Sequence, residues 1–140
     1  MDFNILLVED SPTDAAILIA AFESIGYKGN IQIAQTGTEA ITALENASTA
    51  ESTNTPTLIL LDLNLPRKNG HEILQEIKNN DLWKSIPTLI FSSSSSPADI
   101  AKSYQLHANA HLAKPRELEK YKHVAQHIHS FWLDIAELPA

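Results

Sequence analysis

The chain has 140 residues, of which 44% are hydrophobic and 19% are charged, and this predicts one globular domain over residues 1–140 with a real core. Its formal net charge of −7 argues against binding to nucleic acid, which relies on Lys and Arg to neutralise phosphates. The sequence has no cysteine, which excludes disulfides and a thiolate nucleophile, and it has no apolar run long enough to span a membrane, so we expect a cytoplasmic protein.

Short apolar runs alternate along the chain with longer segments of helical pattern. Three of the runs are almost continuously apolar, as in parallel strands that are covered on both faces. The expected strands are 3–8, 31–34, 58–61, 88–91 and 110–112. The expected helices are 12–25, 37–46, 70–79, 97–106 and 116–136, of which the last is the longest. This alternation predicts a single α/β domain with a five-stranded parallel sheet.

Two of the expected helices begin with the same four-residue pattern, Ser-Pro-x-Asp, at 11–14 and at 96–99. The serine hydroxyl suits the N-cap, proline suits the first helical position, and the acid suits the first turn. In the first of these helices we expect Ala16, Ile19, Ala20 and Phe22 to lie close together on one face. In the second, the apolar positions are Ile100, Ala101 and Tyr104.

Polar side chains follow the ends of four of the predicted strands. Glu9 and Asp10 follow the first strand and Asp62 the third, while Ser92 follows the fourth and Lys114 the fifth. Because ligands bind beyond the carboxyl ends of parallel strands, we expect these side chains to converge at one edge of the sheet. Clustered carboxylates repel each other unless a cation holds them, and an all-oxygen set suits Mg²⁺ or Mn²⁺.

The same residue types fit the transfer of a phosphoryl group onto a carboxylate. Asp62 is the best-placed nucleophile. We expect the metal ion to be held by the acidic pair, by Asp62 and by the backbone carbonyl of Asn64. Lys114 and the Ser92 hydroxyl would contact oxygens of the incoming phosphoryl group.

The blocks LLVEDSPTD, LILLDLNLPRKNG, IPTLIFSS and HLAKP resemble the signature blocks of response-regulator receiver domains. The resemblance runs from Ile5 to about residue 130 and implies a doubly wound, flavodoxin-like (βα)₅ fold with strand order 2-1-3-4-5. It implies that Asp62 accepts a phosphoryl group from a sensor histidine kinase, and that the acidic pair binds Mg²⁺. It also implies a signalling domain with no enzymatic activity beyond its own phosphorylation and dephosphorylation.

By the same resemblance, Ser92 is the switch hydroxyl and Lys114 contacts the phosphoryl group. In the run of five serines, Ser93 to Ser95 are therefore expected to form a mobile loop at a working site and Ser96 to cap the next helix, so the run is not a linker. At the position three before the lysine, where the family often has Tyr or Phe, this chain has His111. That departs from a rotating aromatic switch and would allow a pH-sensitive one.

The C-terminal segment, about residues 116–140, is longer than a minimal receiver needs. Its end, HSFWLDIAELP, together with LDLNLPRKNGHEIL and SYQLHANAHLAKP, resembles the regulators that partner cyanobacterial phytochromes. This resemblance implies a bacteriophytochrome-like kinase as partner and a domain that stands alone and pairs with itself near the last helix. Phe131, Trp132 and Leu133 are the expected homodimer contact, because a helix that is apolar on more than one side usually meets a second surface. Output is then expected through protein contact, dimerisation or onward phosphotransfer.

Two functions from other classes are open alternatives. A receiver-like scaffold would bind its partner equally well with or without a modified Asp62, but the complete set of site residues argues against it. A small haloacid-dehalogenase-type phosphohydrolase also uses an aspartate at a strand end, but it usually carries a second acid where this chain has Asn64. His123 and His127 have a spacing that suits zinc, yet no third ligand is evident, so we expect solvated histidines.

Overall fold

The computed structural model describes residues 3–49 and 55–139, so the outermost residues of the predicted domain lie outside the described part. Five parallel strands form one sheet in the order β2-β1-β3-β4-β5, which confirms the predicted fold and strand order. The strands are β1 (Asn4–Val8), β2 (Asn30–Ala34), β3 (Leu58–Leu61), β4 (Thr88–Ser92) and β5 (Ala110–Ala113). The helices are α1 (Pro12–Ser24), α2 (Gly37–Ala47), α3 (Gly70–Asn79), α4 (Pro97–Gln105) and α5 (Leu118–Ile128), and a π-helical segment, η1 (His129–Ile135), follows α5.

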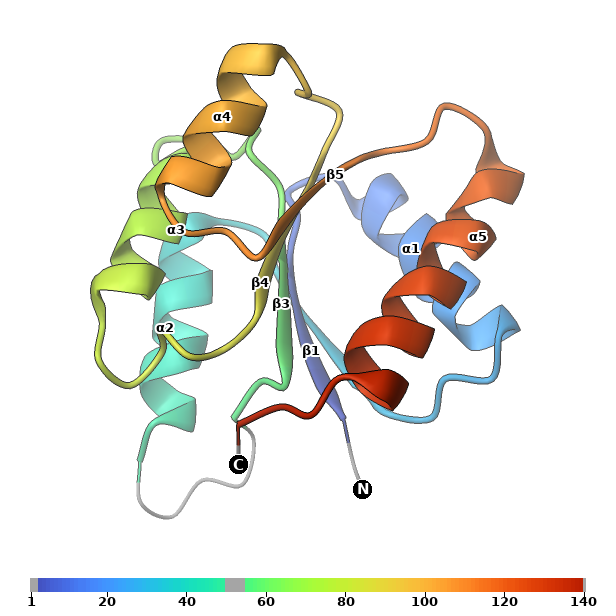
Figure 1. Cartoon of the computed structure of the whole chain (residues 1–140), viewed down its shortest axis with the longest axis horizontal. Coiled ribbons are helices and arrows are strands. Elements are labelled where there is room, and N and C mark those ends of the chain that lie inside the picture. The colour runs from blue at the N-terminus through green and yellow to red at the C-terminus, as the bar shows by residue number, and fades with distance from the viewer. Residues whose placement is uncertain (1–2, 50–54, 140) are drawn as a thin grey trace.

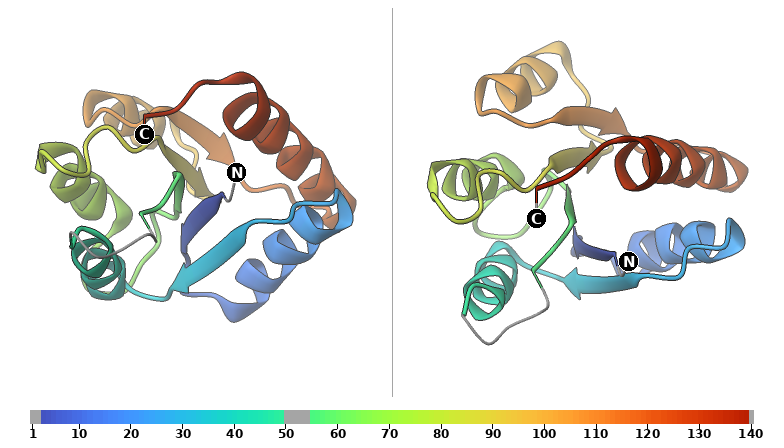
Figure 2. Two further views of the ribbon diagram at one scale, coloured as in Figure 1. Left: turned by 90° about the horizontal axis from the view of Figure 1, so that it is seen from below. Right: turned by 60° about the horizontal axis from the view of Figure 1, so that its bottom comes forward.

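The helices cover both faces of the sheet. Helices α2, α3 and α4 lie on one face, and α1 and α5 lie on the other (Figures 1 and 2). Successive side chains of a strand point to opposite faces, so Leu6 and Val8 pack toward the first group of helices, while Ile5 and Leu7 pack toward the second. Strands β1, β3 and β4 are covered on both sides, which is why their sequences read as almost unbroken apolar runs.

The sheet therefore separates two hydrophobic cores. The first core joins strand residues to α2, α3 and the α3–β4 connection, and its largest members include Leu44, Ile59, Leu61, Ile73, Leu74, Ile77 and Trp83. The second core joins the other strand faces to α1, α5 and η1, through residues that include Leu18, Phe22, Leu58, Leu60, Phe91, Tyr121, Ile128 and Leu133. Trp132 packs partly buried against the second core.

Both Ser-Pro-x-Asp segments begin helices, as predicted. The Ser11 hydroxyl accepts a hydrogen bond of 3.2 Å from the backbone N–H of Asp14, and the Ser96 hydroxyl accepts one of 3.1 Å from that of Asp99. Each proline occupies the first position of its helix, where a missing N–H costs nothing. Because α1 follows β1 and α4 follows β4, both helices start at the edge of the sheet where the strands end, which we call the carboxyl edge.

The buried faces of α1 and α4 differ from the predicted ones. Helix α1 buries Ala15, Leu18, Ala21 and Phe22, and not the face of Ala16, Ile19 and Ala20. The stretch AAILIAAF is apolar all round, so its periodicity does not single out one face. In α4 the buried residue is Ser103, whose hydroxyl is hydrogen-bonded, while Ala101 and Tyr104 are exposed.

The other boundaries lie within two residues of the predicted ones, but the last helix is not uniform. Glu117 has an extended backbone, so α5 begins at Leu118 and not at residue 116. Beyond Ile128 the chain continues as a π-helix, and the Ala136 N–H donates to the Phe131 carbonyl over 2.7 Å, an i to i+5 bond. Among the described residues, none of the helices combines the length and the hydrophobicity that a membrane-spanning helix requires.

Candidate functional site

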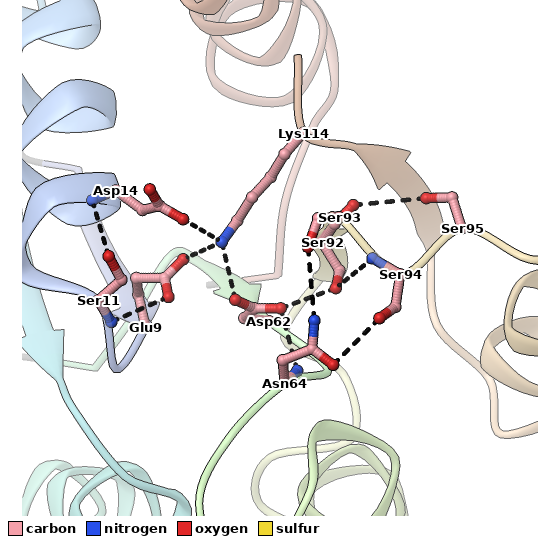
Figure 3. A network of polar contacts seen from close by, with 10 residues as sticks. All are labelled: Glu9, Ser11, Asp14, Asp62, Asn64, Ser92, Ser93, Ser94, Ser95 and Lys114. Atoms are coloured by element: carbon pink, nitrogen blue, oxygen red, sulfur yellow. Dashed lines mark hydrogen bonds and ion pairs between the residues drawn. The ribbon is translucent and has the colours of Figure 1, made fainter. Parts of the chain in front are cut away.

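The carboxyl edge of the sheet brings together the side chains that the sequence singled out. Glu9 and Asp10 leave β1, Asp62 leaves β3, Ser92 ends β4 and Lys114 leaves β5. Figure 3 shows Asp62 between Lys114 on one side and the serine loop on the other. The side chains converge because β1, β3, β4 and β5 are neighbouring parallel strands, which all end at the same edge of the sheet.

Asp62 is buried, with 4% of its surface exposed, and both of its carboxylate oxygens accept hydrogen bonds. Oδ1 accepts from the Ser92 hydroxyl over 2.7 Å and from the Asn64 backbone N–H over 3.1 Å. Oδ2 accepts from Nζ of Lys114 over 2.8 Å. Burial raises the pKa of Asp62, but the bonds from Lys114, Asn64 and Ser92 outweigh it and hold the pKa below its usual value. Asp62 is therefore a fixed, ionised carboxylate.

Lys114 is the central cation of the site. Its ammonium contacts Oε1 of Glu9 at 2.5 Å, Oδ2 of Asp14 at 2.9 Å and Oδ2 of Asp62 at 2.8 Å. Burial lowers the pKa of Lys114, but hydrogen bonds to Asp62, Glu9 and Asp14 outweigh that effect and raise it. Asp14 was not predicted to belong to the site. The one signal for it is its position in the first turn of α1, the helix that begins beside the acidic pair.

Glu9 has a raised pKa. Burial and the nearby negative charge of Asp62 raise it to about 7, although the hydrogen bond from Lys114 acts in the opposite direction. Its second oxygen accepts from the backbone N–H of Ser11 over 3.2 Å. A buried carboxyl with a raised pKa beside a second carboxylate is a group that a bound cation would favour in its ionised form.

A divalent metal ion fits this edge of the sheet. Glu9, Asp10 and Asp62 each offer a carboxylate oxygen, and these oxygens lie within 4.8 Å of one another. Asp10 is exposed and the other two are buried, which gives a hard, all-oxygen site with one side open to water, as Mg²⁺ and Mn²⁺ prefer. Glu9, Asp10 and Asp62 thus lie together, as expected, and fit a divalent metal ion, while their roles as metal ligands stay a prediction. The role of the Asn64 carbonyl stays a prediction.

The serine run forms one wall of the site. The Ser92 hydroxyl donates to Asp62 and also accepts from the backbone N–H of Ser94 over 3.1 Å. The Ser94 hydroxyl donates to Oδ1 of Asn64 over 3.0 Å, so the loops after β3 and β4 are joined across the mouth of the site (Figure 3). Ser92 thus ends β4, Ser93 to Ser95 form a hydrogen-bonded loop, and Ser96 caps α4.

The ring of His111 lies in a polar network. Its Nε2 is 3.3 Å from the Ser95 hydroxyl and its Nδ1 is 2.9 Å from the Ser103 hydroxyl, which also lies 3.0 Å from Nε2 of His71. The Ser103 hydroxyl donates its one proton to the Asp99 carbonyl, so toward the two rings it can only accept. Burial lowers the pKa of both histidines, which favours the neutral rings. None of these polar partners was predicted.

The residues of the C-terminal segment separate into core and surface. Leu133 is 6% exposed and belongs to the second core, which corrects the expectation that it is available for contact with a second copy. Phe131 and Ile135 are 52% and 69% exposed, and Trp132 is partly buried.

The His123 and His127 rings lie side by side on α5. Nδ1 of His127 lies 2.9 Å from the His123 carbonyl oxygen. In the described part of the chain, the only group of three potential metal-ligating side chains is the one formed by Glu9, Asp10 and Asp62.

Comparison with known proteins places the chain clearly. Residues 5–126 match the response regulator receiver domain. The chain is 40% identical to response regulator Rcp1 of Synechocystis over 136 residues, which cover 97% of this chain and 92% of that protein. The crystal structure of the phosphorylated cyanobacterial phytochrome response regulator RcpA superposes with a TM-score of 0.91 at 35% identity, over the full length of both chains. The Mn²⁺-bound form of Rcp1 superposes with a TM-score of 0.86 at 39% identity, over 99% of both chains.

Proposed function

The chain belongs to the response regulator receiver domain family of two-component signalling, and we propose that it accepts a phosphoryl group on Asp62 from a sensor histidine kinase. The observation that carries this proposal is the state of Asp62. It is a buried, ionised carboxylate whose orientation is fixed by three donors from three different segments of the chain.

The proposed reaction is an in-line displacement at phosphorus. A carboxylate oxygen of Asp62 forms the new O–P bond while the P–N bond to the kinase histidine breaks, and the freed histidine keeps the electron pair. Lys114 and the Ser92 hydroxyl lie on opposite sides of Asp62, where they would each donate to a phosphoryl oxygen. A divalent ion bound by Glu9, Asp10 and Asp62, with the Asn64 carbonyl as a further ligand, would supply neutralising charge.

The same geometry supports a route by which the modification is transmitted. The Ser92 hydroxyl joins Asp62 to the backbone of Ser94, and Ser95 joins that loop to His111 on β5. If Ser92 turns to the phosphoryl group, the loop and the start of α4 move with it, and a partner protein can read the new surface of α4 and β5. Output by protein contact, by dimerisation or by onward phosphotransfer remains part of the proposal.

The proposed partner is a kinase of the phytochrome type. This rests on the similarity to RcpA, which is a cyanobacterial phytochrome response regulator, over the whole of both chains. Self-association through the exposed Phe131 and Ile135 is proposed as well, because two large apolar side chains on one short helical segment favour burial against a second surface. The net charge of −7 supports a protein partner and not a nucleic acid.

The test is intact-mass spectrometry after incubation with acetyl phosphate, with and without Mg²⁺, beside Asp62→Asn as the control. We expect one added phosphoryl group that requires both the metal ion and Asp62. If acetyl phosphate is consumed over many turnovers without an adduct, the phosphohydrolase alternative gains support. If it is neither consumed nor transferred, the scaffold alternative replaces the proposal.

A further inference from the structure

The ammonium of Lys114 has no donor to spare. An ammonium carries three N–H donors, and Lys114 has three carboxylate partners, Glu9, Asp14 and Asp62, all within 2.9 Å. The lysine side chain is 7% exposed, so water contributes little to holding it. The position of its charged end therefore depends on these three acids (Figure 3).

Two of the three acids have a second binding role under the proposed function, on which this inference rests. Glu9 and Asp62 belong to the set of carboxylates that fits a divalent ion, and Asp62 is also the proposed acceptor of the phosphoryl group. Metal binding and phosphorylation would each occupy a carboxylate oxygen of these residues and weaken its contact with the ammonium. Asp14 is outside the metal-binding set, and Lys114 is its one ion-pair partner among the described residues.

The local structure holds Asp14 in place for this contact. Its backbone N–H is bonded to the Ser11 hydroxyl, and the Ser11 N–H is bonded to Oε2 of Glu9, so the first turn of α1 is fixed to the same acid that Lys114 contacts. Pro12 restricts the backbone between them. The Asp14 side chain is 37% exposed, so water solvates it on one side while it accepts from the buried ammonium on the other.

We propose that Asp14 is a positioning residue that keeps the Lys114 ammonium beside Asp62 when Glu9 and Asp62 engage a metal ion and a phosphoryl group. Asp14 does not touch the reacting atoms. It acts through the lysine. Without Asp14, the flexible four-carbon side chain of Lys114 would adopt other conformations once Glu9 and Asp62 bind the metal ion and the phosphoryl group.

A simpler role for Asp14 is that of an acid in the first turn of a helix, where it interacts with the helix dipole. The chain offers a matched control for this role. Asp99 occupies the same place in the second Ser-Pro-x-Asp segment, with the same serine cap, and its side chain has no ion pair with Lys114. A purely helical role predicts the same effect at both positions.

The experiment compares Asp14→Asn, Asp14→Glu and Asp99→Asn with the wild-type protein in two measurements. The first is the exchange of the Lys114 ammonium protons with water, followed by nitrogen NMR with and without Mg²⁺. We expect faster exchange in Asp14→Asn, with the larger difference in the presence of Mg²⁺, partial recovery in Asp14→Glu and no change in Asp99→Asn.

The second measurement is the rate of phosphorylation by acetyl phosphate. It should fall about tenfold in Asp14→Asn, the equivalent of one charge-assisted hydrogen bond, and stay unchanged in Asp99→Asn. Equal behaviour of Asp14→Asn and Asp99→Asn in both measurements would overturn the inference. If the wild-type protein takes up no phosphoryl group, the proposed function fails, and the ammonium exchange alone decides whether Asp14 positions Lys114.

Discussion

Replacing Gly70 by alanine should displace the backbone segment that carries the acceptor Asp62. Gly70 is the first residue of α3, and its N–H donates to the Leu63 carbonyl over 3.0 Å. A Cβ at this position would lie 2.2 Å from the carbonyl oxygen of Asp62 and 2.6 Å from Cα of Leu63. These neighbours are backbone atoms of the segment that carries the acceptor, so no side-chain rotation can relieve the clash.

The size of the effect follows from two opposing contributions. Forcing a methyl group against backbone costs about 1–3 kcal/mol, and alanine in place of glycine in a helix returns up to about 1 kcal/mol. We expect a net loss of about 1–2 kcal/mol in the free energy of unfolding, measured by urea denaturation. Because the displaced backbone carries Asp62, the rate of phosphorylation by acetyl phosphate should fall as well.

Gly37→Ala is the matched control for this substitution. Gly37 is also the first residue of its helix, but a Cβ there would meet Cδ1 of Ile73 at 2.4 Å and Cγ1 at 2.7 Å, atoms of a buried core side chain and not of the segment that carries the acceptor. We expect that variant to lose about 1–3 kcal/mol of stability as well, because it overpacks the core, but to be phosphorylated normally. An equal fall in phosphorylation rate in Gly70→Ala and Gly37→Ala would show that the close approach to the Asp62 backbone has no special effect.

Two further predictions concern the histidine network and the exposed end of the last helix. Burial lowers the pKa of His71 and His111 below 6.5 in the folded protein, so the unfolded chain binds protons more readily than the folded one. The stability that these residues contribute above pH 6.5 is therefore lost as the pH falls through their pKa values in the folded protein. His111→Gln should therefore reduce the loss of stability as the pH falls below about 6.5, and an unchanged pH dependence in urea unfolding would contradict this. Phe131→Ser should convert a dimer into a monomer in sedimentation equilibrium with no loss of fold, whereas Leu133→Ser should destabilise the domain itself by about 2–5 kcal/mol, because Leu133 is buried. A monomeric wild-type protein, or a dimer that survives Phe131→Ser, would contradict the proposed contact.

The fold could be predicted because its signals are local. The apolar runs of the central strands and the two capped helix starts each depend on a few adjacent residues. The convergence of Glu9, Asp62 and Lys114 could also be predicted, since it follows from the parallel direction of the strands and needs no knowledge of side-chain packing.

The missed features depend on contacts between distant segments. The ion pair of Asp14 with Lys114 joins residues 100 positions apart, and the sequence indicates only that Asp14 suits a helix start. Ser103 is buried because two histidine rings and a carbonyl satisfy its hydroxyl, whereas hydrophobic periodicity favours its apolar neighbours. The buried face of α1 was assigned wrongly because a helix that is apolar all round leaves the choice to its tertiary neighbours.

The division of the interior into two cores gives the protein a built-in pair of optical reporters. The chain contains two tryptophans, and they lie on opposite sides of the sheet: Trp83 is in the first core, with its indole N–H bonded to the Ser48 hydroxyl at 2.8 Å, and Trp132 packs against the second. Replacing either one by phenylalanine leaves a single tryptophan, whose emission follows one layer alone. Coincident unfolding curves from the two variants would mean that the sheet binds both layers into one cooperative unit, and separated curves would show which layer loosens first.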